Sequence, residues 1–190
     1  GVRGRGAALN PGNRFEDVRL HVLGDYLDEV IAENPDGTRV TTRVYADRSR
    51  SVINRVDSPD LPFNWTINPY RGCEHGCIYC YARPGHEYLG LSCGLDFETK
   101  IMAKQDSASL LRDELSKKSW LGESISISGV TDCYQPIEAK LRITRSVLEV
   151  CAEFAQPVTL VTKNKLILRD LDLLKELAKH RAAGAAVSIT

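Results

Sequence analysis

The sequence predicts an α/β protein in which strands separated by helices form a parallel sheet. The main observation is the order of segments from Trp65 onward, where short apolar or alternating runs are followed by amphipathic runs of helical length. Such an order is typical of right-handed βαβ units. The chain has 190 residues, of which 43% are hydrophobic and 26% charged. These values are typical of a globular chain that can build one core with an extension.

Each segment of the predicted core carries its own local signal. Pro69 ends the first strand candidate, and the long cysteine-rich loop follows it. Asp106 is a good N-cap for the helix expected over residues 107–118. Strands are expected at residues 64–70, 97–104, 123–130, 157–164 and 185–190, and further amphipathic helices at 137–155 and 168–183, the last one ended by Gly184.

Two regions of different character are expected along the chain. Residues 1–64 form an N-terminal extension, made of a Gly-rich arm and a small β-rich segment with a turn at residues 34–37. Residues 65–190 form the core. The sequence stops inside a strand at Thr190, so we expect a sheet truncated after its fourth core strand, or one whose edge is covered by another chain.

Composition and charge exclude few partners but favour none. The 25 basic and 25 acidic residues balance, so net charge predicts neither a polyanionic nor a membrane partner. No apolar run is long enough to span a bilayer, and no signal peptide is visible. Arginines gather between residues 39 and 55, and we interpret them as a solvated, salt-bridged surface rather than a phosphate-binding one.

Three of the six cysteines lie within eight residues, in the pattern Cys73-x3-Cys77-x2-Cys80. Three thiols on one short loop favour metal binding in a reducing cytoplasm over disulfides. A structural zinc site needs four ligands, and His75, His86 or Cys93 would have to supply the fourth at an unconvincing spacing. Ferredoxin loops also use four cysteines. A site with three protein ligands keeps one position open, as catalytic metals do.

The segment CEHGCIYC, with Tyr79 as the aromatic residue before the last cysteine, resembles the signature of the radical-SAM superfamily. The longer run NPYRGCEHGCIYCYAR and the opening GRGAALNPGNRFE resemble the subgroup related to spore photoproduct lyase, in particular bacterial proteins without an assigned substrate. The resemblance implies a partial TIM-like barrel and a 4Fe–4S cluster held by Cys73, Cys77 and Cys80. It also implies S-adenosylmethionine (SAM) bound at the remaining iron, with Tyr79 against the adenine.

The same resemblance suggests further SAM-binding residues at the ends of core strands. Thr131 and Asp132 stand where lyase-like members carry a Ser-Asp pair in place of the family's usual Gly-Gly-Glu-like motif. Lys163 matches a lysine that reaches the SAM carboxylate, and Ser188 matches a serine that contacts the cofactor. Local alternatives remain open, since an aspartate at a strand end is often a helix cap and a lysine past a strand is often simply exposed.

The implied function is reductive cleavage of SAM to a 5′-deoxyadenosyl radical that abstracts hydrogen from a substrate. An external electron donor of flavodoxin or ferredoxin type is implied as a partner, and a nucleic-acid substrate rests on analogy to one relative. Cys133 is a weak candidate for a hydrogen-atom donor, because it follows Asp132 whereas the relatives' cysteine precedes the pair. For Gln135 and Glu138 we favour a structural role. The alternative function is a non-catalytic zinc or iron–sulfur module.

Overall fold

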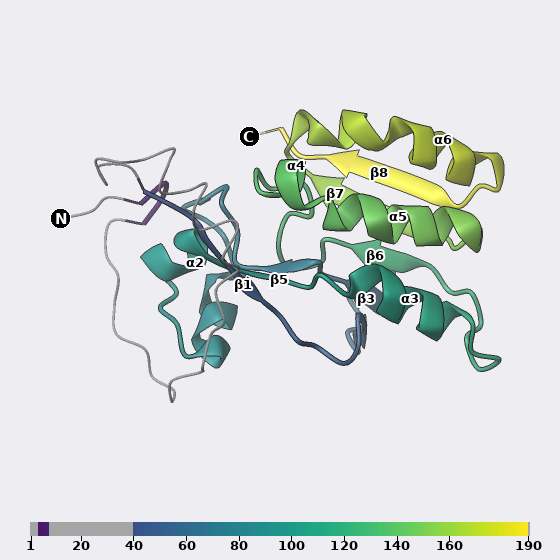
Figure 1. Cartoon of the computed structure of the whole chain (residues 1–190), viewed down its shortest axis with the longest axis horizontal. Helices are drawn as coiled ribbons and strands as arrows, with labels where there is room; N and C mark the ends of the chain where they lie inside the picture. Colours follow the sequence, from purple (N-terminus) through teal and green to yellow (C-terminus); the bar gives the residue numbers. More distant parts are fainter. Residues whose placement is uncertain (1–3, 8–39, 190) are drawn as a thin grey trace. The chain divides into compact units, whose positions relative to one another are not determined.

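The computed structural model describes residues 4–7 and 40–189, which fall into two compact units (Figure 1). The first unit contains the described residues 4–7, 40–47 and 70–103, and the second contains residues 48–69 and 104–189. The predicted extension therefore supplies parts of both units, and its predicted turn at residues 34–37 lies outside the described residues.

The second unit is built on a five-stranded sheet with the order β2-β3-β6-β7-β8. Its last four strands run parallel, and β2 pairs antiparallel with β3. The predicted strands at 123–130, 157–164 and 185–190 are found here, although shorter or shifted. The strand bounds are Ile53–Arg55 (β2), Trp65–Ile67 (β3), Ile125–Ile127 (β6), Val158–Thr162 (β7) and Ala183–Val187 (β8).

One face of this sheet is covered by helices that pack side by side, α3 against α5 and α5 against α6 (Figure 1). Along β7, Val158, Leu160 and Thr162 are buried, whereas Thr159 and Val161 are exposed, so one face of this strand joins the core. The helix bounds are Ser107–Leu115 (α3), Glu138–Leu141 (α4), Ile143–Glu153 (α5) and Leu171–Lys179 (α6), with a 3-10 helix η2 over Lys165–Asp170.

The first unit contains a three-stranded sheet with the order β1-β5-β4. Strand β5 pairs parallel with β1 and antiparallel with β4. The remaining elements of the unit lie between β4 and β5 in sequence, and they follow the cysteine loop. The bounds are Arg43–Ala46 (β1), Tyr70–Arg71 (β4), Lys100–Ala103 (β5), Arg83–Leu89 (3-10 helix η1) and Leu95–Thr99 (α2).

Two strand predictions need correction. The strand expected over 97–104 exists as β5, but it belongs to the small sheet of the first unit rather than to the parallel sheet. The strand expected over 64–70 is divided into β3 and β4, which lie in different sheets. Pro69 stands between them, and a proline cannot donate the hydrogen bond that would continue a strand.

Two helix predictions were also wrong in detail. The helix expected over 137–155 is broken into α4 and α5 by Arg142, which has a left-handed backbone with φ of 55°. The Glu138 carboxylate accepts the backbone N–H of Thr144 and Arg145 and so caps α5. Gly184 does not end the last helix, because it lies in β8 opposite Thr159.

The predicted α/β class is confirmed, with a run of four parallel strands and helices between them. No helix in the part of the chain that the structure describes combines the length and the apolar character needed to cross a bilayer.

Burial of His86 makes the stability of the chain depend on pH. The imidazole is 2% exposed and packs edge-on against Phe97, with 5.5 Å between ring centroids. Burial lowers its pKa to about 4, although the charge of Asp96 acts in the opposite direction. Between about pH 6.5 and pH 4, His86 is therefore protonated in the unfolded chain but neutral in the folded chain. The free energy of unfolding falls as the pH drops through this interval.

We expect this single group to remove up to about 3 kcal/mol of unfolding free energy over that pH interval. Urea unfolding of the chain at pH 4 to 7 measures it, as the pH-dependent part of the difference in unfolding free energy between wild type and His86→Leu. His180→Asn, which replaces an exposed histidine, is measured beside it to separate the effect of burial from the loss of a histidine as such. A His86→Leu profile parallel to wild type would contradict the assignment.

Candidate metal centre and cofactor site

The three clustered cysteines lie on a tight loop of the first unit, between β4 and η1. Two turns shape it, with the Gly76 N–H donating to the Cys73 carbonyl at 3.3 Å and the Cys80 N–H donating to the Cys77 carbonyl at 3.2 Å. Gly76 has φ of +60°, which a glycine adopts without strain. Cys73 is buried, whereas Cys77 and Cys80 are partly exposed, and none of the three forms a disulfide.

Arg83 binds the backbone of this loop through hydrogen bonds from its guanidinium. Its guanidinium donates from Nε and Nη2 to the Cys77 carbonyl at 3.2 and 3.1 Å, and from Nη1 to the carbonyls of Cys93 and Gly94. It also pairs with the fully buried Glu98 at 2.6 Å and lies over the ring of Phe97. Arg83 therefore both packs on an aromatic ring and donates hydrogen bonds to the loop backbone.

The loop supplies three thiols as the donors of any metal ion or cluster bound there. Cys73 packs with Ala82 and Phe97, and Cys80 contacts the same small group. Among residues 4–7 and 40–189, no three His, Cys, Asp or Glu side chains gather around one point as a single ion requires. Thiolates that hold an iron–sulfur cluster bind separate irons and do not need to converge in that way.

The side chains of the loop differ in their access to solvent. Tyr79 is 64% exposed. His86, considered above as a fourth ligand, is instead enclosed against Phe97. Cys93 is partly exposed, and its carbonyl shares Arg83 with that of Cys77.

In the second unit, the carboxyl ends of the parallel strands form a polar edge. Asn68 follows β3 and accepts the Val130 N–H through Oδ1 at 2.9 Å. Ser188 follows β8 and donates its N–H to the Thr162 carbonyl at 2.8 Å. Lys163 follows β7 directly. The edge therefore brings together the predicted residues Asp132, Lys163 and Ser188, and ligands of open α/β sheets bind at such edges.

Asp132 is the centre of this edge. Its Oδ1 accepts the Tyr134 N–H at 2.8 Å and the Thr162 hydroxyl at 2.7 Å, and its Oδ2 accepts the Lys163 N–H at 3.0 Å. The carboxylate thus ties the loop after β6 to the end of β7.

Sequence reasoning missed the residue that shapes the loop after β6. Ser128 has φ of 79°, unusual for a residue with a side chain. Its hydroxyl donates to the Thr131 carbonyl and accepts the Cys133 N–H, which fixes the turn. The turn places Thr131 with only 4% exposure, so this predicted site residue lies inside the loop rather than on the edge.

Cys133, the weak candidate for a hydrogen-atom donor, is enclosed in the core of the second unit. Burial raises the pKa of its thiol well above the usual range, and the neighbouring Asp132 charge acts in the same direction. A thiol in this position behaves as a small apolar side chain.

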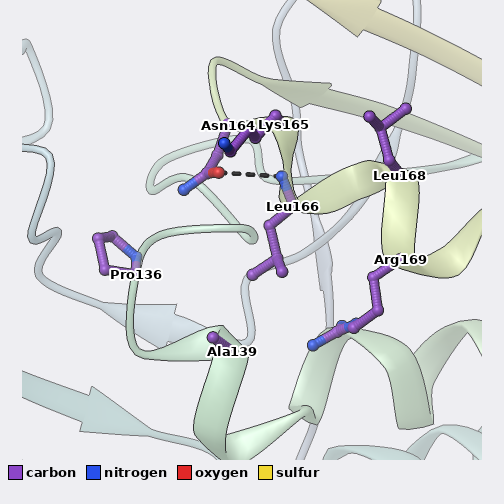
Figure 2. Close-up of a pocket in the computed structure, with 7 residues that line it drawn as sticks. All are labelled: Pro136, Ala139, Asn164, Lys165, Leu166, Leu168 and Arg169. Atoms are coloured by element: carbon purple, nitrogen blue, oxygen red, sulfur yellow. Dashed lines mark hydrogen bonds between the residues drawn. The ribbon is translucent and has the colours of Figure 1, made fainter.

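A cavity of about 530 Å³ opens beside the same edge, between the start of α4 and η2 (Figure 2). This volume is in the range of small-molecule sites. Asn164 shapes its rim by accepting the Leu166 N–H through Oδ1 at 2.9 Å. The lining combines apolar side chains with three polar ones, and comprises Pro136, Ala139, Asn164, Lys165, Leu166, Leu168 and Arg169.

A buried ion network supports this cavity. Arg169 pairs with Glu138 at 2.6 Å and with Asp170 at 2.7 Å, and Arg145 pairs with Asp170 at 2.9 Å. Both acids are fully buried. Burial and the nearby Asp170 charge raise the pKa of the Tyr134 hydroxyl. The network joins α4, η2 and α5, and the structural role expected for Glu138 is confirmed by these contacts.

Comparisons with known proteins give relatives without an assigned activity. Uncharacterized proteins of Mycobacterium tuberculosis and Mycobacterium bovis are each 39% identical to the chain over 141 residues, which is 74% of this chain and 42% of the relative. An uncharacterized protein of Methanocaldococcus jannaschii is 30% identical over 129 residues, 68% of this chain and 46% of the relative. No protein-family model and no solved structure matches. The chain thus spans less than half the length of these curated relatives.

Proposed function

We propose that this chain forms the cluster-binding and cofactor-binding part of a radical-SAM enzyme. The observation that carries the proposal is the loop with Cys73, Cys77 and Cys80, none of which forms a disulfide, and whose backbone is held by two turns and by Arg83. Three thiolates on one loop match a 4Fe–4S cluster with one iron open to SAM.

The fold supports the proposal at a second level. The four parallel strands have helices between them and polar loops at their carboxyl ends, features that a TIM-like barrel shares. We propose that β3, β6, β7 and β8 are strands of such a partial barrel.

Within the proposed mechanism, the residues of the chain bind and orient. When bound, the cluster supplies one electron for cleavage of the carbon–sulfur bond of SAM. The Lys163 ammonium is assigned to the SAM carboxylate, Asp132 to its amino group, and Ser188 to a further polar contact. The exposed ring of Tyr79 is assigned to the adenine. Thr131 is assigned to the loop geometry that presents Asp132.

The electron and the substrate come from outside the chain. A flavodoxin- or ferredoxin-type protein is the proposed electron donor. The proposed substrate is a molecule that loses a hydrogen atom, and the resemblance to a DNA-repair lyase names nucleic acid as the first class to assay.

The test is formation of 5′-deoxyadenosine and methionine from SAM by the anaerobically reconstituted, dithionite-reduced chain. Lys163→Ala should raise the KM for SAM by about tenfold or more, because a charge-assisted hydrogen bond contributes about 1.5–3 kcal/mol. Lys175→Ala removes an exposed lysine of α6 and should leave the KM unchanged. The proposal fails if the cluster-loaded chain yields no 5′-deoxyadenosine, and the role of Lys163 fails if both variants behave alike.

A further inference from the structure

A short turn near the N-terminus, Gly4–Ala7, packs directly on the cysteine loop. The Gly4 N–H donates to the Ala7 carbonyl at 2.9 Å and closes the turn. Arg5 donates from Nη1 to the Glu98 carbonyl at 2.6 Å, and the Gly6 N–H donates to both carboxylate oxygens of Glu98 at 3.1 and 3.0 Å. The turn is therefore bound to a residue more than 90 positions away in the sequence.

The contact between turn and loop leaves no room for a side chain. A Cβ placed on Gly6 would lie 1.8 Å from the Gly76 carbonyl oxygen. A Cβ placed on Gly76 would lie 2.6 Å from the Cβ of Arg5. Gly76 directly precedes Cys77, so the turn lies in close contact with the backbone that sets the position of the Cys77 thiol.

Charges on both sides of the contact are matched. Glu98, with no exposed surface, pairs with Arg83, which also binds the Cys77 carbonyl. Glu74, directly after Cys73, is buried and lies 3.7 Å from Arg5. Two carboxylates and two guanidiniums balance in a site where an unpaired charge would be costly.

We propose that the Gly4–Ala7 turn is a working part of the cysteine loop and that Arg5 is a positioning residue for it. Gly6 and the backbone of the turn fix the conformation of the cysteine loop and thereby the positions of its thiols. The positive charge of Arg5, next to Glu74, also stabilises an added electron at the loop and so raises the reduction potential of a cluster held there. This second role rests on the proposed function, whereas the first does not.

The first experiment measures loop geometry in the cluster-free 190-residue chain. Cys77 and Cys80 are alkylated, and mass spectrometry follows the rate at each site. Gly6→Ala should speed alkylation of Cys77 severalfold, because the added Cβ displaces the loop backbone and further exposes a thiol that is only partly exposed in the folded chain. Gly85→Ala is the matched control, since a Cβ there meets nothing within 4 Å. Equal rates in Gly6→Ala and wild type would overturn the proposal.

The second experiment measures the reduction potential of the reconstituted chain by an EPR-monitored titration. Arg5→Ala should shift the potential downward, and Arg5→Lys should restore most of the shift by restoring the charge. Equal potentials in all three chains would overturn the electrostatic role. If the wild-type chain binds no cluster, the proposed function fails, whereas the alkylation rates still decide the role of the turn.

Discussion

Replacing Cys77 by serine should remove nearly all iron and acid-labile sulfide from the reconstituted chain, whereas replacing Cys93 by serine should leave both in place. Cys77 is one of three thiols on the anchored loop, and a cluster held by three ligands cannot be retained by two. Cys93 lies in the same unit but outside the three-cysteine loop, and Arg83 donates a hydrogen bond to its backbone carbonyl rather than to its thiol. Iron and sulfide analysis with absorption spectra measures the difference.

The Cys93→Ser variant also separates the two classes of function. Loss of metal from this variant would mean that Cys93 supplies a fourth ligand. A fully ligated site leaves no position open to SAM, so this outcome would favour a structural zinc or an electron-transfer cluster.

Replacing Asp170 by asparagine should lower the free energy of unfolding by about 3 kcal/mol, because removal of one member of a buried ion network leaves its partners uncompensated. The Asp170 carboxylate accepts Arg145 at 2.9 Å and both Nε and Nη2 of Arg169 at 2.8 and 2.7 Å. Its side chain has no exposed surface. Urea unfolding at neutral pH measures the loss.

Asp172 provides the matched control for this prediction. It pairs with the same Arg145 at 2.7 Å, but its side chain is 59% exposed. The hydrogen bonds from Arg145 lower the pKa of Asp172 to about 2, so this carboxylate is charged at neutral pH. The pKa of Asp170 is also lowered, so the two variants both remove a charged carboxylate. Asp172→Asn should change stability far less, since water screens an exposed pair. Losses of equal size in the two variants would show that burial of the network is not what stabilises it.

Local sequence patterns predicted where the strands and helices of the second unit lie, but they did not predict which strands pair with one another. Strands β6, β7 and β8 carry apolar runs next to amphipathic helices, and both properties are local. The segment of β5 carries the same kind of signal, yet it pairs with β1 and β4 in a separate sheet. Alternation of apolar residues shows that a strand exists, but it does not show which strand lies beside it.

The candidate site shows the same division between local and distant information. The cysteine spacing and the strand-end positions of Asp132, Lys163 and Ser188 are local, and the structure places each of them as a loop or edge residue. The contact of Arg5 with Glu98 spans 93 residues, and no local pattern predicts such a pair. Ser128 was also missed, because its role depends on a left-handed backbone that serine seldom adopts.

EPR spectroscopy of the anaerobically reconstituted, dithionite-reduced chain, recorded with and without SAM, tests the central claim most directly. The account predicts a 4Fe–4S(+1) signal whose g values shift when SAM is added, because SAM binds the iron that Cys73, Cys77 and Cys80 leave open. A cluster signal that is the same with and without SAM, or a chain that binds zinc in place of a cluster, would contradict it.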